Sequence, residues 1–225
     1  MSIPIISIDG PGGSGKGTIT REVASYLNWH ILDSGALYRI VALAIERHQI
    51  DWDDEVKIIE IIPKLNIDFQ IDRVDRQIIY LNEVDVTKDI RGEKCGNNAS
   101  RIAKFSQVRS ELLSLQRKFI RFPGLVADGR DMGTIVFPEA ILKIFLTASA
   151  SERSKRRYKQ LKEQGINVSL TAVLRDILIR DERDEKRAIA PLVPAQDAVT
   201  IDSSDLSIED VSQKIIRLYK ARTNT

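Results

Sequence analysis

The chain alternates short apolar runs with longer segments in which apolar residues recur at helical spacing. A short apolar run bounded by turn residues is typical of a buried strand, whereas recurrence at every third or fourth residue is typical of an amphipathic helix. Strands alternating with helices predict an α/β fold with a mainly parallel sheet. The predicted strands are 3–8, 29–32, 125–128, 141–146 and 198–201. The predicted helices are 18–27, 36–47, 53–62, 90–105, 106–119, one that begins near 151, 169–184 and 207–219.

One stretch interrupts this pattern. Residues 66–71, 77–82 and 84–86 alternate apolar and polar positions and are separated by charged turns. Alternation with a period of two is typical of strands that have one solvated face. We therefore predict a small antiparallel sheet that is inserted into the α/β fold and is not a second core.

A glycine-rich segment lies between the first predicted strand and the first predicted helix, and it consists of Gly10, Pro11, Gly12, Gly13, Ser14, Gly15, Lys16, Gly17 and Thr18. Strand, glycine loop and helix form the context of a phosphate-binding loop. Glycines let backbone N–H groups point at phosphate oxygens, the helix N-terminus adds partial positive charge, and Lys16 adds a full charge. The segment predicts a nucleoside triphosphate site, and the alternative is an ordinary glycine-rich turn. In the usual motif a Ser or Thr that binds magnesium follows the lysine, but here Gly17 follows and the hydroxyl comes at Thr18.

Polar residues also follow the second predicted strand. Ligands of open α/β sheets bind at the carboxyl ends of strands, which places Asp33, Ser34 and Arg39 on the functional edge. A helix N-cap explains Asp33 or Ser34 equally well, but it does not explain Arg39 in the next turn. These residues alone do not decide between a site and a cap.

The run Asp-Gly-Arg-Asp-Met-Gly-Thr occupies 128–134, directly after another predicted strand. Two carboxylates and an arginine between glycines at a strand's carboxyl end indicate a second site element. The alternative is a solvated turn.

Two charged helices within 151–184 are joined through Gly165. Arg153 and Arg157 share a helix face, for which a solvated basic face is the ordinary explanation. The dense charges of 180–187 are likewise typical of an exposed helix with ion pairs. Transfer of a γ-phosphoryl group, however, depends on cations that a mobile segment can supply. The two helices are therefore predicted to form a lid, and the arginines favour an anionic acceptor such as a phosphate monoester.

Length and composition set further bounds. A chain of 225 residues with 43% hydrophobic content can form one α/β domain with insertions, which is what we expect. The 34 basic and 32 acidic residues nearly cancel, which gives no reason to expect nucleic-acid or membrane binding. A single cysteine, Cys95, and the lack of a leader or an apolar run of roughly 18 residues favour the cytoplasm. Cys95 is expected to be a passive residue, and the chain is expected to be a monomer.

Four segments together resemble the bacterial cytidylate kinases: 10–18, 32–39, 127–134 and 183–194. The likeness extends over essentially the whole chain, including the insert after Pro63 and the stretch 98–100. The order Lys-Gly-Thr is normal for nucleoside monophosphate kinases. The resemblance implies a P-loop kinase fold with a central five-stranded parallel sheet flanked by helices, a small antiparallel β insert and a helical lid. The implied regions of this single kinase domain are a core of 1–34, 120–150 and 191–225, a monophosphate-binding region of 35–119 and a lid of 151–190.

The resemblance also implies an activity, the transfer of the ATP γ-phosphate to CMP or dCMP. The donor would be bound by the glycine loop with Arg153 and Arg157. The acceptor would be bound by Ser34, Arg39, Ser100, Arg109, Arg130, Asp131, Arg180, Asp184 and Arg187. The residues implied to act in catalysis are Lys16, Asp33, Arg130, Arg157 and Arg187. Among the acceptor residues, Ser100, Arg109 and Asp131 would read cytosine, since a carboxylate accepts from the N4 amino group while Ser and Arg donate to N3 and O2.

Magnesium is expected to accompany ATP, held mostly by phosphates and water, with Thr18 as one candidate ligand. Asp33 would orient a magnesium-bound water or a phosphate-binding arginine. Two other functions remain open from the sequence. One is a kinase of the same architecture that acts on UMP, AMP or a small non-nucleotide acceptor, and the other is a nucleotide-binding switch without catalysis. The sequence has no Asn-Lys-x-Asp element for guanine, which argues against a GTPase.

Overall fold

The computed structural model describes residues 3–71, 77–163 and 165–223. The chain forms two compact units, one of Met1–His30 with Phe122–Thr225 and one of Ile31–Arg121. The first unit contains most of the predicted core and the predicted lid. The second contains the predicted monophosphate-binding region. The single-domain organisation stays a prediction.

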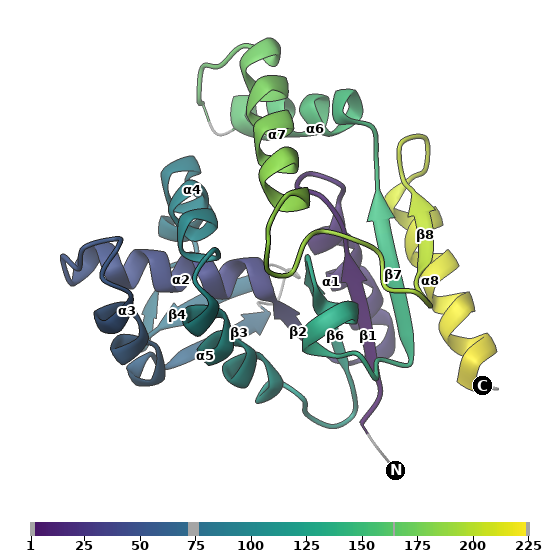
Figure 1. Ribbon diagram of the computed structural model, residues 1–225. Helices are drawn as coiled ribbons and strands as arrows, with labels where there is room; N and C mark the ends of the chain where they lie inside the picture. The colour runs from purple at the N-terminus through teal and green to yellow at the C-terminus, as the bar shows by residue number, and fades with distance from the viewer. Residues whose placement is uncertain (1–2, 72–76, 164, 224–225) are drawn as a thin grey trace. The chain divides into compact units, whose positions relative to one another are not determined.

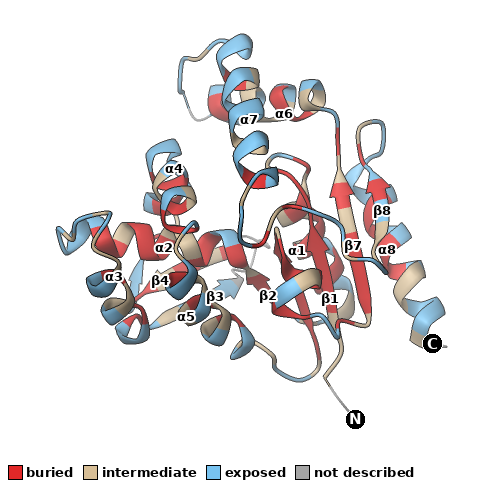
Figure 2. Ribbon diagram, viewed as in Figure 1, coloured by how far each residue is buried: buried red, intermediate tan, exposed pale blue. Residues whose placement is uncertain are grey.

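The main sheet has five strands in the order β2-β6-β1-β7-β8. These strands are β1 (Ile5–Asp9), β2 (His30–Asp33), β6 (Leu125–Gly129), β7 (Leu142–Thr147) and β8 (Val199–Asp202). β1 pairs in parallel with β6 and with β7, and β7 pairs in parallel with β8. The predicted parallel sheet is confirmed. Figure 2 shows that β1 and β7 are largely buried, which explains why both read as apolar runs.

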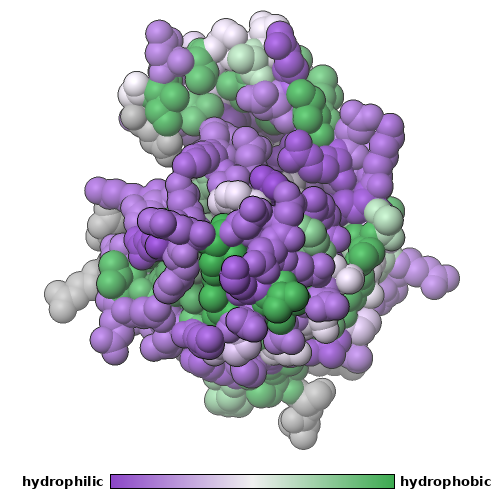
Figure 3. Space-filling view, turned by 60° about the vertical axis from the view of Figure 1, so that its left-hand side comes forward, coloured by the Kyte–Doolittle hydropathy of each residue, from purple (hydrophilic) through white to green (hydrophobic). Residues whose placement is uncertain are grey.

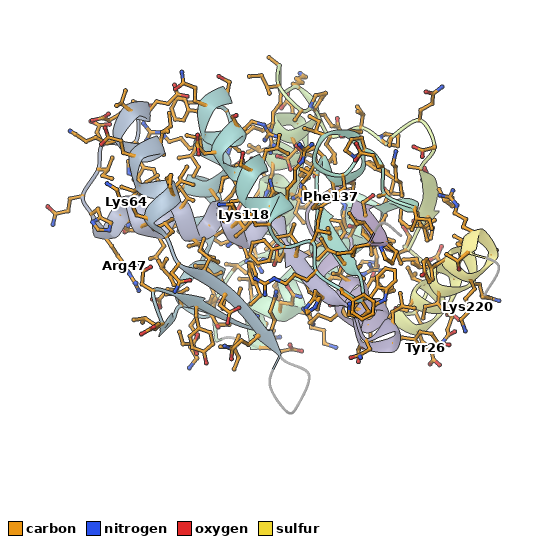
Figure 4. The ribbon with its side chains drawn as sticks, turned by 90° about the horizontal axis from the view of Figure 1, so that it is seen from below. Tyr26, Arg47, Lys64, Lys118, Phe137 and Lys220 are labelled. Carbon is orange, nitrogen blue, oxygen red and sulfur yellow. The ribbon has the colours of Figure 1, made fainter. Side chains whose placement is uncertain are left out.

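Two helices of the first unit, α1 (Lys16–Leu27) and α8 (Ile208–Thr223), pack against each other and against strands of the sheet. Each buries an apolar stripe, which includes Ile19 and Val23 on α1 and Ile215 on α8. At the surface the Lys220 ammonium donates to the Tyr26 hydroxyl at 2.8 Å, which joins the ends of the two helices (Figure 4). α1 begins two residues earlier than predicted, at Lys16, because the helix starts directly from the glycine loop.

The predicted lid consists of α6 (Ala150–Glu163) and α7 (Leu170–Glu185), which pack side by side beyond the carboxyl end of β7 (Figure 1). The connection contains Gly165 at φ +76°, a conformation that favours glycine. α7 begins at a serine cap, where the Ser169 hydroxyl accepts from the Ala172 N–H at 3.1 Å. The predicted pair of helices joined through Gly165 is therefore confirmed.

The second unit combines helices with a three-stranded sheet in the order β3-β4-β5. Its strands are β3 (Ile67–Ile71), β4 (Gln77–Leu81) and β5 (Val84–Asp85), and both pairings are antiparallel. Its helices are α2 (Ser34–Arg47), α3 (Glu55–Ile61), α4 (Glu93–Ile102) and α5 (Ser106–Arg117). The predicted antiparallel insert is confirmed. The charged turn expected within 72–76 lies outside the described residues.

The single long helix predicted over 90–105 is wrong. A 3₁₀ turn occupies Asp89–Arg91, and α4 begins only at Glu93 and ends at Ile102. Gly92 separates the two with an extended backbone, φ −64° and ψ 153°, which a continuous helix does not allow. A π-helical turn at Met132–Val136 was also not predicted, because its five residues are too few to show a periodicity.

The surface is mostly polar. Figure 3 shows a face on which hydrophilic residues predominate, with small hydrophobic areas between them. Among the described residues, no helix combines the length and the apolar character that crossing a membrane requires.

Candidate active site

The glycine loop runs from the end of β1 to the start of α1, as predicted. Gly10 has φ +147°, and a Cβ there would lie 2.0 Å from the carbonyl oxygen of Leu146 on the neighbouring strand. Gly15 caps α1 at φ +96°. Both positions require glycine, because a side chain would be strained in either backbone conformation and would collide at Gly10. Because Gly10 lies so close to Leu146, the loop stays against the end of the sheet. The first N–H groups of α1 can then bind an anion.

Lys16 points back into its own loop. Its ammonium donates to the Pro11 carbonyl at 2.8 Å, and the residue is only 6% exposed. Burial is the main reason why the pKa of Lys16 falls to about 7, and the Arg130 guanidinium lowers it further against the attraction of Asp128. A bound triphosphate would reverse this shift, because its negative charge favours the ammonium form.

An arginine cluster surrounds one buried carboxylate. Asp184 on α7 is 1% exposed and accepts from Arg130 Nε at 2.8 Å and from Arg187. Burial alone would raise the pKa of Asp184, but the two guanidinium groups outweigh it and hold the pKa below its ordinary value. Arg130 follows β6 and Arg187 follows α7. Residues predicted from two separate segments, 127–134 and 183–194, therefore meet at Asp184. The interpretation of the charged helix end as a solvated face is wrong for Asp184.

Arg180 and Arg130 also lie beside the glycine loop. A Cβ built on Gly12 would be 3.5 Å from Arg130 Nη2 and 3.9 Å from Arg180 Cδ. These side chains and Lys16 concentrate positive charge at the loop. This arrangement is suited to an anion with several negative charges.

Arg153 is engaged by protein groups. Its guanidinium donates to both carboxylate oxygens of Asp181, at 2.9 and 2.6 Å, and to the carbonyls of Gly12 and Ala148, at 3.1 and 2.9 Å. The residue is 5% exposed. A solvated basic face, the ordinary explanation of its spacing, is therefore wrong for Arg153. Arg157, one turn on, is more accessible and donates to Gln160 at 3.4 Å.

The second unit contains four of the predicted acceptor residues: Ser34, Arg39, Ser100 and Arg109. Arg39 donates to the carbonyls of Ile90 and Gly92, at 2.7 and 3.2 Å, and its backbone carbonyl accepts from the Cys95 thiol. Burial raises the pKa of that thiol, which agrees with the expected passive role of Cys95. Asp33 caps α2 by accepting from the Ala36 N–H at 2.9 Å, and Ser34 is buried in the first turn. The cap interpretation of Asp33 is confirmed, and it does not exclude a second role.

Two of the predicted cytosine readers lie in this unit. The Arg109 guanidinium carbon is 5.9 Å from the centre of the Tyr38 ring, within the range of a cation–π contact. The Ser100 hydroxyl is buried and has no hydrogen-bond partner among the described residues. A buried hydroxyl without a partner is costly in a finished structure, which is a reason to look for a ligand at that position.

Sequence reasoning missed three residues: Asp181, Tyr38 and Asp9, whose carboxylate accepts from the Met132 and Gly133 N–H groups. Asp181 lies within a run of charges, and nothing in its spacing distinguishes it. Tyr38 lies in the segment 32–39, where nothing in the sequence points to its ring. Asp9 carried a usable signal, since it is a charged residue at the end of an apolar strand immediately before the glycine loop.

Within 3–71, 77–163 and 165–223, no group of three or more His, Cys, Asp and Glu side chains is arranged to hold a metal ion. The Thr18 hydroxyl accepts from Arg21 Nη2 at 3.3 Å, so a cationic group already faces this candidate ligand.

Comparison with known proteins gives a consistent answer. The family model described as cytidylate kinase matches residues 6–221. A protein from Colwellia psychrerythraea named cytidylate kinase is 53% identical over 96% of this chain and 95% of its own length. Proteins of the same name from Aeromonas hydrophila and Pseudomonas syringae are 50% and 51% identical, over 92% and 96% of this chain and 90% and 95% of theirs.

Proposed function

Because the chain belongs to the cytidylate kinase family, we propose how its residues carry out the transfer of the γ-phosphate of ATP to CMP or dCMP. The products are CDP or dCDP and ADP. The observation that carries the assignment of residues is the contact of Arg130, Arg187 and Asp184 beside the glycine loop. It supplies cations where two phosphate groups must meet.

We propose that the donor is bound by the glycine loop. The N–H groups at the start of α1 would bind phosphate oxygens, and the Lys16 ammonium would leave the Pro11 carbonyl for the β- and γ-phosphates. Arg157 is proposed to contact the same phosphates from α6. For Arg153, which the resemblance also assigns to ATP, the contacts with Asp181 and Gly12 support a role in shaping the loop around the phosphates.

The acceptor phosphate is proposed to be bound by arginines. Arg130 and Arg187 would provide two of them, with Asp184 holding both guanidinium groups in place. Arg39 and Ser34 are proposed to bind the same phosphate, and Arg180 is proposed to lie near the sugar. Such cations offset the repulsion between the acceptor's dianion and the γ-phosphate, and they stabilise the charge that spreads over the transferred group.

Base recognition is proposed for Ser100, Arg109 and Asp131. The unpartnered Ser100 hydroxyl and the Arg109 guanidinium would donate to the acceptor atoms N3 and O2, and the Asp131 carboxylate would accept from the N4 amino group. Uracil presents a carbonyl oxygen in place of that amino group. The Asp131 carboxylate would repel that carbonyl oxygen, which would disfavour UMP.

The transfer itself requires positioning more than covalent chemistry. An oxygen of the CMP phosphate, largely dianionic at neutral pH, attacks the γ-phosphorus in line, and the bond to the ADP oxygen breaks. Closure of α6 and α7 would exclude water and bring Arg157 to the reacting phosphates. Magnesium bound to ATP would neutralise part of the phosphate charge, and Asp33 is proposed to orient one of its water ligands.

Location and partners follow from the substrates. Both are small nucleotides of the cell interior, and the only cysteine is buried with a raised thiol pKa, so we infer a cytoplasmic enzyme that needs no disulfide. We propose a monomer without a nucleic-acid partner, supported by the near balance of basic and acidic residues. Measurement of ADP formation with CMP, dCMP, UMP and AMP as acceptors tests the proposed function directly.

A further inference from the structure

Asp9 is a buried carboxylate outside the proposed binding residues, and it accepts two backbone hydrogen bonds. It is the last residue of β1, and its carboxylate accepts from the Met132 N–H at 2.8 Å through Oδ1 and from the Gly133 N–H at 2.7 Å through Oδ2. Asp9 is 4% exposed. Both oxygens are thus occupied by successive N–H groups of one loop.

These N–H groups open the π-helical turn Met132–Val136 and have no partner within that turn. A carboxylate that accepts from two adjacent N–H groups fixes both the position and the direction of the backbone there. Arg130 and Asp131 are the two residues immediately before the turn. The residue after Asp9 is Gly10, the first residue of the glycine loop. Asp9 therefore connects the glycine loop with the loop that carries Arg130 and Asp131.

We propose that Asp9 is a positioning residue that holds Arg130 and Asp131 at a fixed place relative to the glycine loop. The proposal deepens the acceptor site and rests on the functions proposed for those two residues. An asparagine of the same shape would not substitute, because its amide nitrogen is a donor and would face one of the two N–H groups.

The charge on Asp9 is maintained against its surroundings. Burial is the main reason why the pKa of Asp9 is raised to about 6; the N–H groups of Gly133 and Met132 and the Lys16 ammonium oppose this rise, and the Asp131 carboxylate adds to it. Protonation places a hydrogen on one oxygen and removes one of the two acceptors. The loop contact is therefore progressively lost as the pH falls through about 6.

The contact is measured directly by NMR, because the chain has only two methionines, Met1 and Met132. Labelling with ¹⁵N-methionine, with the Met132 amide signal assigned by its loss in Met132→Leu, therefore isolates this one amide. We expect this signal to titrate near pH 6 in the unmodified enzyme and to lose that transition in Asp9→Asn. In Lys16→Leu and Asp131→Asn, which remove the neighbouring charges without adding a methionine, the transition is expected to remain with a shifted midpoint.

Kinetics at pH 8 test the positioning role. We expect Asp9→Asn to reduce kcat/KM for CMP by about tenfold or more and to change KM for ATP by less than about threefold. Asp54→Asn is the matched control, since Asp54 also accepts a backbone N–H, from Lys57 at 3.1 Å, and lies outside the proposed site. Its kcat/KM should be that of the unmodified enzyme.

Several outcomes would overturn the inference. One is a Met132 signal that does not titrate near pH 6, or that titrates unchanged in Asp9→Asn, and this result needs no active enzyme. Another is an Asp9→Asn enzyme with unaltered kcat/KM for CMP. If the unmodified enzyme did not phosphorylate CMP at all, the proposed function would fail, whereas the Met132 titration would still decide whether Asp9 holds the loop.

Discussion

The guanidinium of Arg153 and the carboxylate of Asp181 form a two-point ion pair between α6 and α7, and the same guanidinium donates to Gly12 in the glycine loop. The side chains are 6% and 14% exposed. The pair therefore connects the phosphate loop to the helix that carries Arg180 and Asp184. Two residues therefore link α6, α7 and the glycine loop.

Removing one partner of this pair should be costly. Asp181→Asn would leave a buried guanidinium without its counter-charge, and we expect the free energy of unfolding to fall by about 3 kcal/mol in chemical denaturation. Glu182→Gln is a matched control on the same helix, because it breaks the exposed pair of Glu182 with Lys186, and it should leave stability unchanged. Equal midpoints for Asp181→Asn and the unmodified enzyme would show that the pair does not stabilise the fold.

ATP binding should take up a proton at Lys16. With a pKa of about 7 the free enzyme holds little charge on Lys16 at pH 8, and the triphosphate should restore it, so binding should take up about 0.9 proton at pH 8 and almost none at pH 5.5. Affinity should accordingly fall as the pH rises above 7. Calorimetry in buffers of different ionisation enthalpy measures the uptake. Lys16→Met is the control, and an unchanged uptake in that variant would assign the proton to another group.

Ser100→Ala should separate binding from stability. Since its hydroxyl has no hydrogen-bond partner among the described residues, its removal breaks no bond in the free enzyme and should not lower the unfolding midpoint. The loss of a donor to cytosine should raise KM for CMP about fivefold to tenfold, with KM for ATP unchanged. Ser212→Ala, which removes another buried hydroxyl without a described partner, should change neither constant. A KM for CMP that is unaffected by Ser100→Ala would show that Ser100 does not bind the base.

Asp33 caps α2, so a loss of activity in Asp33→Ala has two explanations. That change should cost about 1 kcal/mol of stability through the lost cap, whereas Asp33→Asn retains a capping side chain and should keep stability. If Asp33 acts in the reaction, both variants should lower kcat about tenfold or more and leave nucleotide binding nearly unaltered. Full turnover by Asp33→Asn would restrict Asp33 to capping.

Much of this architecture could be predicted from the sequence, because its signals are local. The apolar runs predicted all five strands of the main sheet to within a few residues. The glycines and Lys16 predicted the phosphate-binding loop without any information from distant residues. The break at Gly92 was missed because the apolar residues of 90–105 keep a helical spacing across it. The π-helical turn was missed because it is too short to show a periodicity, and because the carboxylate that binds its first two N–H groups, Asp9, lies more than 120 residues away along the chain.

The site shows the same division between local and distant information. Arg130, Asp184 and Arg187 were selected through family motifs, and the structure adds that one buried carboxylate joins both arginines. From spacing alone, Arg153 was predicted to lie on a solvated helix face. No local pattern reveals that Asp181, on another helix, supplies its counter-charge. Such pairings depend on the tertiary fold and are invisible to periodicity.

The most direct measurement is kcat/KM for a panel of acceptors with ATP as the donor. CMP and dCMP should be the best acceptors, and UMP should be poorer by about tenfold or more because its base lacks the N4 amino group that Asp131 is proposed to accept from. AMP should be poorer still. Higher kcat/KM for UMP or AMP, or tight ATP binding without acceptor-dependent ADP formation, would contradict the account.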